Sequence, residues 1–449
     1  RHRRSGSAVM SRFSIRAAAD AAPDRIAALV AGEPWTYARL AEAMSTRSID
    51  GDGPVVCVPQ PGLDGMLDVL AAFDAGRPLV PLHPRWSDDE RRAFADAVLG
   101  GPPLAADTLA ILATSGSSGR PKGVELSRGA FVASADASAR RIGWAPDGDR
   151  WLLTLPLAHV GGLSILVRCW LARRTVVVPP PHQRFDPVVV ARWLDAWGVT
   201  LVSWVPTQLR RMLDRPDWRP PTSLRLVLLG GAAASPTLLD EARERGLDVR
   251  PTYGMTEACS QVATLGSASD DGVGRPLDGV EVRIAGAGES DESGPIEVRG
   301  PVMMTGYRPT GGGSGLDADG WFRTGDLGRL DANGCLHVLG RADAVIVTGG
   351  ENVHPAPVEA AIEALDGVSK ACVVGLADVE WGQIVAAAVE PMAGAVLDAE
   401  VVRQRLRGRL AAFRIPRRIA IVDRLPTTPS GKIDRQGVAV RLAVAAGGA

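Results

Sequence analysis

Short, almost uninterrupted apolar runs alternate with amphipathic stretches through the first half of this 449-residue chain. The runs are rich in valine, isoleucine and leucine and cover residues 109–113, 151–157, 175–178, 201–205 and 224–229. Strands that are buried on both faces have this continuous pattern, whereas half-exposed strands alternate apolar with polar residues. Between the runs, apolar side chains recur at helical spacing, as in Val188, Val189, Trp193 and Trp197. The pattern therefore predicts an α/β fold built on a parallel sheet.

The pattern changes twice in the second half of the chain. Between residues 279 and 339, short segments are separated by glycine, aspartate and asparagine, which predicts a β-rich, turn-dense subdomain. Beyond residue 340, a helical pattern precedes strand-like runs at 371–375, 384–389 and 419–422. We therefore expect a large N-terminal domain over residues 1–340, made of α/β subdomains and the β-rich subdomain. A hinge would join it to a small α+β C-terminal domain over residues 341–449.

Charge and cysteine content narrow the classes of partner. The formal net charge of −1 creates no long-range field that would favour nucleic acid or an anionic membrane, so we expect small-molecule partners. Five cysteines form no CxxC pair, which is typical of a reducing compartment. Residues 151–167 form the longest uncharged apolar stretch, and we interpret them as a buried strand and a turn rather than a membrane span. The chain is expected to be cytoplasmic, and homo-oligomerisation stays open.

A loop of glycine and hydroxyl residues follows the apolar run at 109–113. Its backbone N–H groups, its hydroxyl groups and a lysine can close around a polyphosphate. A Walker A loop is excluded, because the spacing from Gly116 to Lys122 is wrong and Pro121 disfavours a helix at Arg120. The residues that we expect to bind the polyphosphate here are Thr114, Ser115, Gly116, Ser117, Ser118, Gly119 and Lys122.

This loop resembles the phosphate-binding signature of the acyl-adenylating superfamily, which includes acyl-CoA synthetases, luciferases and peptide-synthetase adenylation domains. Further segments resemble motifs of that superfamily in the same order, at residues 230–235, 252–257, 321–326, 340–343 and 425–435. The resemblance implies that Gly231 and Ala232 flank the adenine of ATP and that Tyr253 stacks on it. It also implies that Asp326 and Arg341 contact the ribose. Taken alone, Asp326 reads equally well as an ordinary turn residue.

The same resemblance assigns the chemistry. Thr256 would touch the α-phosphate, Glu257 would help to hold Mg²⁺, and Asp343 would be the hinge residue. A carboxylate that attacks the α-phosphate brings two anions together, so the site needs cations that are already in place. Lys432, one of three lysines among 50 basic residues, is the best candidate for this catalytic role. A single protein carboxylate suffices for Mg²⁺, which usually keeps several waters.

The segment from residue 348 to residue 355 resembles the CoA-ligase form of this region. The resemblance implies that Gly349 and Gly350 line the path of the pantetheine arm of coenzyme A, because glycine allows a ligand to run against the backbone. A tight turn before a helix explains these glycines equally well.

The acid is indicated by three further segments, at residues 155–163, 205–209 and 259–264. They look most like the o-succinylbenzoate–CoA ligases of menaquinone synthesis. The resemblance implies that His159 is a gate between the acyl and thiol sites, and that Ser260 and Gln261 donate hydrogen bonds to the acid. A second carboxylate on this acid would require an arginine, which the sequence does not single out.

The sequence therefore predicts an ATP-dependent carboxylic acid–CoA ligase that acts through an acyl-AMP intermediate, most like the o-succinylbenzoate–CoA ligases. Its cofactors and co-substrates would be ATP, Mg²⁺ and coenzyme A. Three alternatives stay open: another aryl- or acyl-CoA ligase, a stand-alone adenylation enzyme that loads a carrier protein, and a catalytically silent nucleotide-binding protein.

Overall fold

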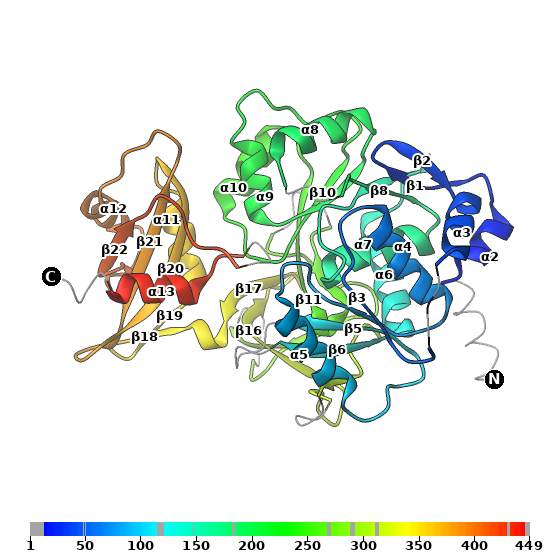
Figure 1. The fold of residues 1–449 in the computed structure, drawn as a ribbon. Helices are drawn as coiled ribbons and strands as arrows, with labels where there is room; N and C mark the ends of the chain where they lie inside the picture. The colour runs from blue at the N-terminus through cyan, green and yellow to red at the C-terminus, as the bar shows by residue number, and fades with distance from the viewer. Residues whose placement is uncertain are drawn as a thin grey trace.

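The computed structural model describes residues 13–47, 49, 51–114, 121–146, 148–181, 185–266, 271–287, 292–309, 314–428 and 432–444. Its strands form four sheets. Three sheets belong to the larger part of the molecule, and the fourth, with α11 to α13, stands beside it in Figure 1.

The largest sheet has eight strands in the order β12-β11-β10-β9-β7-β8-β1-β2. Its central strands are parallel and comprise β1 (Ile26–Val30), β8 (Thr175–Val178), β7 (Arg150–Leu152), β9 (Leu201–Trp204), β10 (Leu226–Leu229) and β11 (Val249–Met255). The edge strands β2 (Glu33–Thr36) and β12 (Ser260–Thr264) are antiparallel to their neighbours. The predicted parallel sheet is confirmed for these central strands. The edge strands β2 and β12 follow short connections, which permit only antiparallel pairing.

Both faces of this sheet are covered, as the continuous apolar runs indicated. On one face, Val177, Val202 and Val227 pack under α8 (Pro187–Ala196), α9 (Pro206–Leu213) and α10 (Pro236–Glu244). On the other face, Val176 and Leu228 join the main core. The predicted helix at Val188–Trp197 is α8, where Pro187 occupies the first turn and Asp186 accepts hydrogen bonds from the N–H groups of residues 188 and 189.

A second, five-stranded sheet has the order β15-β6-β5-β4-β3. Its strands are β3 (Val55–Cys57), β4 (Leu79–Pro81), β5 (Thr108–Thr114), β6 (Lys122–Ser127) and β15 (Gly306–Arg308). The described helices that precede α8 in the chain are α2 (Ile15–Ala21), α3 (Tyr37–Ser45), α4 (Leu63–Asp74), α5 (Asp88–Leu99), α6 (Arg128–Ile142) and α7 (Val160–Leu171).

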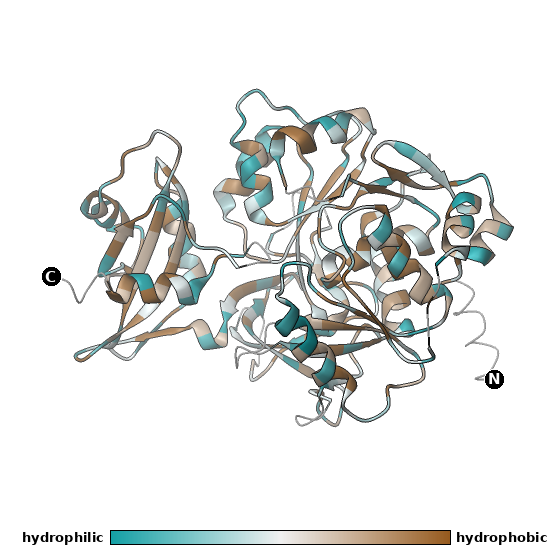
Figure 2. Cartoon of the chain, viewed as in Figure 1, coloured by the Kyte–Doolittle hydropathy of each residue, from teal (hydrophilic) through white to brown (hydrophobic). Residues whose placement is uncertain are grey.

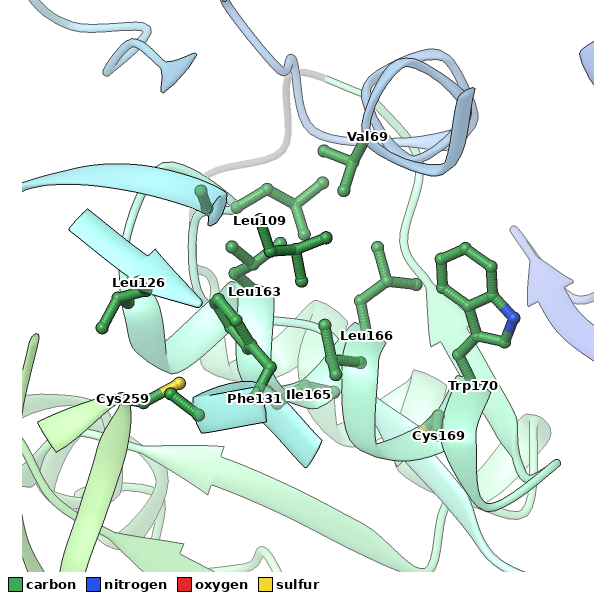
Figure 3. Close-up of a cluster of buried hydrophobic side chains, with 14 of the residues drawn as sticks. Val69, Leu109, Leu126, Phe131, Leu163, Ile165, Leu166, Cys169, Trp170 and Cys259 are labelled. Carbon is green, nitrogen blue, oxygen red and sulfur yellow. The ribbon is translucent and has the colours of Figure 1, made fainter. Parts of the chain in front are cut away.

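The main hydrophobic core lies where α4, α6 and α7 meet the strands of the second sheet. Figure 3 shows Val69 of α4, Phe131 of α6 and Leu166 of α7 close to Leu109 and Leu126. Every one of these five side chains is at most 2% exposed. Apolar colouring is strong on the buried strands in Figure 2, whereas the peripheral helix α5 is mostly hydrophilic.

The prediction for residues 151–167 was wrong in its second half. The strand β7 ends at Leu152, and the apolar residues from Val160 onward form helix α7 rather than a turn. Gly162 lies so close to the preceding segment that a Cβ atom there would be 2.2 Å from the carbonyl oxygen of Pro156. Glycine at this position therefore lets the helix begin directly against the loop that precedes it.

The β-rich prediction for residues 279–339 is confirmed by an antiparallel sheet of four strands. They are β13 (Glu281–Ile284), β14 (Gly294–Arg299), β16 (Phe322–Leu330) and β17 (Leu336–Arg341). A turn of 3₁₀ helix, η2 (Ala342–Ala344), follows β17 and leads into the C-terminal part.

The C-terminal part contains one sheet with helices on both faces. Its strands are β18 (Ile346–Thr348), β19 (Glu351–Val353), β20 (Val368–Asp378), β21 (Gly382–Pro391) and β22 (Arg418–Ile421). One apolar cluster lies under α11 (Pro355–Glu363) and α12 (Ala399–Leu406), and a second lies under α13 (Arg435–Val444). The predicted α/β class with an α+β C-terminal portion is confirmed. The boundary between residues 340 and 341 stays a prediction.

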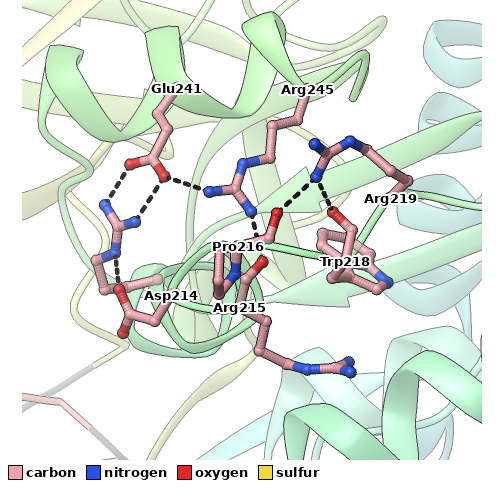
Figure 4. A network of polar contacts seen from close by, with 8 residues as sticks. Asp214, Arg215, Pro216, Trp218, Arg219, Glu241 and Arg245 are labelled. Carbon is pink, nitrogen blue, oxygen red and sulfur yellow. Dashed lines mark hydrogen bonds and ion pairs between the residues drawn. The ribbon is translucent and has the colours of Figure 1, made fainter.

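A polar network clamps α9 to α10 on the large sheet. Arg210 donates hydrogen bonds of 2.6 and 2.8 Å to the two carboxylate oxygens of Glu241, and its Nε donates to Asp214 at 2.7 Å. Arg245 donates to the same carboxylate at 3.1 Å, as Figure 4 shows. Two-pronged arginine–carboxylate pairs of this kind are strong and directional, so they fix the two helices relative to each other.

Within the described residues, none of the helices combines the length and the apolar character that crossing a membrane would need. All five cysteines are free thiols, and four of them are buried.

Candidate active site

The strand pair β5–β6 forms the base of the expected phosphate loop. Thr114, at the end of β5, is paired with Lys122, at the start of β6. The loop therefore joins two antiparallel strands, unlike a Walker loop, which runs from a strand into a helix. Five of the predicted ATP ligands, Ser115, Gly116, Ser117, Ser118 and Gly119, lie outside the described residues.

A second set of predicted ATP ligands follows β10. Gly231 has a φ of +82°, a left-handed conformation that glycine adopts without strain, and Gly231 and Ala232 are both exposed. These residues lie in the connection that leads from β10 into α10. Their contact with adenine stays a prediction.

Tyr253, Asp326 and Arg341 come together from three different strands. The Tyr253 hydroxyl donates a 2.6 Å hydrogen bond to Asp326 Oδ2, and Arg341 Nη1 lies 3.6 Å from Asp326 Oδ1. Burial and the neighbouring Asp326 raise the pKa of Tyr253, so it stays protonated and remains a donor. Arg341 also pairs with Asp343 at 3.2 Å, which places the predicted hinge residue beside the predicted ribose ligands. The hinge role of Asp343 is untested.

Glu257 lies in the 3₁₀ turn η1 (Thr256–Ala258), which connects β11 to β12. Its Oε1 accepts a 2.8 Å hydrogen bond from the hydroxyl of Tyr307, a residue that the sequence analysis did not single out. The Lys122 ammonium lies 5.2 Å from the centre of the Tyr307 ring. Thr256 begins the same turn and is half-buried, and its contact with the α-phosphate stays a prediction.

Lys432 lies close enough to Asp326 and Glu257 for both carboxylates to act on its charge. Although part of Lys432 is exposed, the surrounding protein removes water from the ammonium, and this desolvation lowers the pKa of Lys432. The two carboxylates oppose the effect and raise the same pKa. The C-terminal lysine and the N-terminal nucleotide motifs therefore share one electrostatic environment.

His159 occupies the N-cap position of α7 without a capping hydrogen bond from its side chain, and it lies near the same lysine. Its ring centre is 5.0 Å from that of His83, and its buried Nε2 has no hydrogen-bond partner within the part of the chain that the structure describes. Burial, followed by the positive groups His83, Lys432 and Arg85, lowers the pKa of His159 to about 4. His159 is therefore neutral at pH 7. Its role as a gate is not tested by this geometry.

A buried arginine lies beside Ser260, one of the residues predicted to bind the acid. Arg168 is 4% exposed, and its Nη2 donates a 3.2 Å hydrogen bond to Ser260 Oγ. Its Nε has no partner, and no carboxylate forms an ion pair with it among the described residues. Burial lowers the pKa of Arg168 to about 10, so it still carries its charge at neutral pH. The sequence analysis did not single out Arg168, although it is the one charged residue in the apolar helix α7.

The hairpin β11–β12 explains how Ser260 reaches Arg168. Cys259 and Ser260 have φ values of +50° and +103°, unusual for residues other than glycine. This tight turn reverses the chain just after η1, so that Ser260, three positions after Glu257, begins the return strand β12. The neighbouring Gln261 is buried, and its amide nitrogen donates to Thr264 at 2.7 Å and to Thr252 at 3.3 Å. Because these donors are used inside the hairpin, the prediction that Gln261 donates to the acid receives no support from its hydrogen bonds.

Gly349 and Gly350 form the two-residue turn between β18 and β19, with φ values of +57° and +86°. Such turns need two left-handed residues, so the tight-turn explanation is sufficient for both glycines. A Cβ atom at Gly349 would lie 2.6 Å from the Trp381 ring, which packs behind the turn. The guanidinium of Arg417 covers the Trp381 ring at 3.9 Å. Contact with coenzyme A stays a prediction.

The donor set around Glu257 fits Mg²⁺ bound together with a triphosphate. No cluster of three or more histidine, cysteine, aspartate or glutamate side chains that could hold a metal occurs in the described part of the chain. Mg²⁺ typically takes one or two protein carboxylates and completes its shell with water and phosphate oxygens. Glu257 Oε2 has no hydrogen-bond partner in the described residues, so one carboxylate oxygen remains for such an ion.

Models of known protein families match two parts of this chain. Residues 99–308 match the family described as AMP-binding enzyme, and residues 357–432 match the AMP-binding enzyme C-terminal domain. The 2-succinylbenzoate–CoA ligase of Bacillus licheniformis is 40% identical over 337 residues, covering 73% of this chain and 69% of the relative. The indoleacetate–CoA ligase of Aromatoleum aromaticum is 36% identical, covering 84% of this chain and 75% of the relative.

Solved structures of related proteins also resemble this chain. The o-succinylbenzoate coenzyme A synthetase of Bacillus subtilis, in complex with ATP and magnesium ion, superimposes with a TM-score of 0.82 at 32% identity. The match covers 94% of this chain and 98% of that chain.

Proposed function

The chain belongs to the family of AMP-binding enzymes, and we propose that it ligates o-succinylbenzoate to coenzyme A at the expense of ATP. In the first step, the acid carboxylate attacks the α-phosphorus of ATP and pyrophosphate leaves, giving an acyl-AMP. In the second step, the thiol of coenzyme A loses its proton and attacks the acyl carbon, and AMP leaves.

The observation that carries the proposal is that Lys432 lies near enough to Asp326, Glu257 and His159 for their charges to interact. A mobile C-terminal lysine near the ribose and metal ligands can neutralise the two anions that meet in the first step. Thr114, Lys122 and the loop between them would hold the β- and γ-phosphates. Mg²⁺ on Glu257 would supply further positive charge to the phosphate oxygens.

Arg168 supports o-succinylbenzoate as the acid. This substrate has two carboxylates, one that reacts and one that stays on the benzoyl ring. A buried guanidinium with an unpartnered Nε and no ion-pair carboxylate in the described residues suits the second carboxylate. Ser260, already bonded to Arg168, would complete this end of the site. Acids with a single carboxylate would leave the arginine charge buried and uncompensated, which is costly.

The thiol acceptor proposed here is coenzyme A, whose nucleotide carries several phosphate charges. The C-terminal part has a strongly basic segment from residue 403 to residue 418, with seven arginines in 16 positions. Within it, η3 (Ala412–Arg414) contacts β19, next to the turn at Gly349 and Gly350. Fixed positive charge beside that turn favours an anionic nucleotide over the surface of a carrier protein.

Two further points remain part of the proposal. The C-terminal portion from residue 341 would rotate about Asp343 so that the face of Gly349 replaces Lys432 at the acyl-AMP. The enzyme would work in the cytoplasm, where its three small-molecule substrates are available.

A pyrophosphate-release assay over a panel of acids tests the proposal, with Mg²⁺ and ATP present and coenzyme A added in a second stage. We expect o-succinylbenzoate to be the preferred acid and 4-oxo-4-phenylbutanoate, which lacks the ring carboxylate, to be much poorer. Thioester should then form with coenzyme A. Preference for a monocarboxylic acid would overturn the assignment of the acid, and acyl-AMP that ignores coenzyme A would point to carrier loading.

A further inference from the structure

Tyr307 links two groups that the first half-reaction needs. Its hydroxyl donates a 2.8 Å hydrogen bond to Glu257 Oε1, and its ring centre is 5.2 Å from Lys122 Nζ. Glu257 comes from the turn after β11, whereas Lys122 comes from the end of the phosphate loop. One side chain therefore contacts the proposed metal ligand and the proposed phosphate lysine.

The backbone around Tyr307 is fixed on both sides. Strand β15 pairs with β6, and Tyr307 lies opposite Val124, two positions from Lys122. Just before β15, Met304 N–H donates to the carbonyl of Glu257 at 2.8 Å, and Thr305 N–H donates to that of Glu125 at 2.9 Å. The segment is thus tied to η1 and to β6 at once, which leaves the ring of Tyr307 little freedom to move.

The hydroxyl of Tyr307 is a permanent donor. An ionised carboxylate can only accept hydrogen bonds, so the phenol of Tyr307 must be the donor in this contact. The proton therefore stays on the phenol, and Glu257 Oε1 stays the acceptor. This hydrogen bond holds Oε1 and so restricts the directions in which Oε2 can point.

We propose that Tyr307 is a positioning residue for the metal–triphosphate: its hydroxyl orients Glu257 so that Oε2 faces Mg²⁺, while its ring holds Lys122 at the phosphates. The proposal rests on the function proposed above. It extends to this chain the general behaviour of metal ligands, whose hydrogen-bond partners orient them and tune their affinity.

Tyr307→Phe is the decisive variant, because it keeps the ring beside Lys122 and removes the hydroxyl alone. Calorimetric titration with ATP, with and without Mg²⁺, measures the Kd of ATP directly and requires no turnover. We expect the Kd of ATP in the presence of Mg²⁺ to rise about tenfold, as is typical when such a partner is lost, and the Kd without Mg²⁺ to stay unchanged. Pyrophosphate release should then need more Mg²⁺ and recover when Mg²⁺ is saturating.

Tyr37→Phe is the matched control. Tyr37 is also a buried tyrosine, 1% exposed, and it lies in α3 beside Arg173. Loss of its hydroxyl should lower the melting temperature slightly and leave the Mg²⁺ dependence as in the parent enzyme. If Tyr307→Phe also kept the Mg²⁺ dependence of the parent enzyme, the proposal would be overturned. An equal loss of ATP affinity with and without Mg²⁺ would overturn it as well.

A double-mutant cycle with Glu257→Gln provides a second test of the proposal. In the background of Glu257→Gln, the further change Tyr307→Phe should add no additional Mg²⁺ defect, because the two residues act as one unit. Additive defects would contradict the proposal. If the parent enzyme bound ATP equally well with and without Mg²⁺ and released no pyrophosphate, the proposed function itself would fail, a result distinct from these.

Discussion

The hydroxyl of Tyr253 donates a 2.6 Å hydrogen bond to Asp326 Oδ2, across 73 positions of sequence. The end of β11 in the large sheet is thereby joined to β16 of the antiparallel sheet. The predicted adenine and ribose ligands thus form one bonded unit before any nucleotide arrives. The Asp326 carboxylate also acts to raise the pKa of Lys432.

Asp326→Asn should change the pH dependence of adenylation. The asparagine keeps an acceptor for Tyr253 but removes a negative charge that raises the pKa of Lys432. The pKa of Lys432 should therefore fall, and the lysine should lose its proton at a lower pH. We expect the alkaline limb of the pyrophosphate-release profile, measured at saturating ATP, to move to lower pH. Asp331→Asn, in the turn between β16 and β17, should leave that limb in place, and a shift of the limb to higher pH in Asp326→Asn would contradict the assigned interaction.

Lys432→Ala should abolish the first half-reaction and spare the second. Loss of a group that stabilises developing charge typically costs about 100-fold to 1,000-fold in rate. Pyrophosphate release should fall by at least this factor, whereas thioester formation from supplied acyl-AMP should continue. Lys370→Arg, at another of the three lysines, provides the control. Equal loss of both steps would show that Lys432 has a different role.

Arg168→Met should weaken the binding of the dicarboxylic acid selectively. Removing the partner of a buried charge costs about 2 kcal/mol or more, which corresponds to a rise of about 30-fold or more in the KM for o-succinylbenzoate. The KM for the analogue that lacks the ring carboxylate should change little or improve, because the buried charge is gone. Parallel kinetics with the two acids measure the difference. A similar loss for both acids would mean that Arg168 supports the fold rather than the ring carboxylate.

Gly349→Ala should slow transfer to coenzyme A while leaving pyrophosphate release intact. The added methyl group would lie 2.6 Å from Trp381, at a φ of +57°, so the turn and the ring must both shift. Displacement of this size at a reacting interface costs about 10-fold to 100-fold in rate. Gly350→Asn is the comparison, since nothing lies within 4 Å of a Cβ atom there and asparagine tolerates left-handed backbone. If adenylation slowed as well, the turn would have a role beyond the thiol step.

Glu241→Ala should lower stability without changing the chemistry. It removes the carboxylate shared by Arg210 and Arg245, and Arg210 is buried. We expect a loss of about 1–3 kcal/mol in the free energy of unfolding, measured with urea. Asp240→Ala, whose pair with Arg243 is largely exposed, should change it by less than about 0.5 kcal/mol. Equal effects of the two variants would rule out a structural role for the network.

The sequence predicted the fold well wherever local pattern decides structure. Continuous apolar runs identified the central strands, because both faces of the large sheet are covered. The interruption by glycine and aspartate identified a β-rich region, which the structure shows to be an antiparallel sheet. The error at residues 151–167 arose because proline and two glycines look like turn residues. In the folded chain, Gly162 allows a helix to begin against Pro156, six positions earlier, a contact that residue preferences alone do not reveal.

The active site was predictable only in part. Motif order pointed to Tyr253, Asp326 and Lys432, and the structure brings these three residues together. Arg168 and Tyr307 were missed because their roles come from partners that are distant in the sequence. Tyr307 reaches Glu257 across 50 positions, and Arg168 reaches Ser260 across 92. No local pattern carries that information, although a lone arginine in an apolar helix was a usable sign.

The turn at Cys259 and Ser260 has a consequence for altering substrate choice. In this turn, the proposed metal ligand Glu257 and the proposed acid-binding residue Ser260 are only three positions apart, on either side of the left-handed backbone. Substitutions at Ser260 that aim at a new acid will therefore be transmitted to Glu257 and to nucleotide handling. Position 168 is on a separate helix. Engineering of acid preference should begin there, where selectivity can change while the triphosphate end keeps its shape.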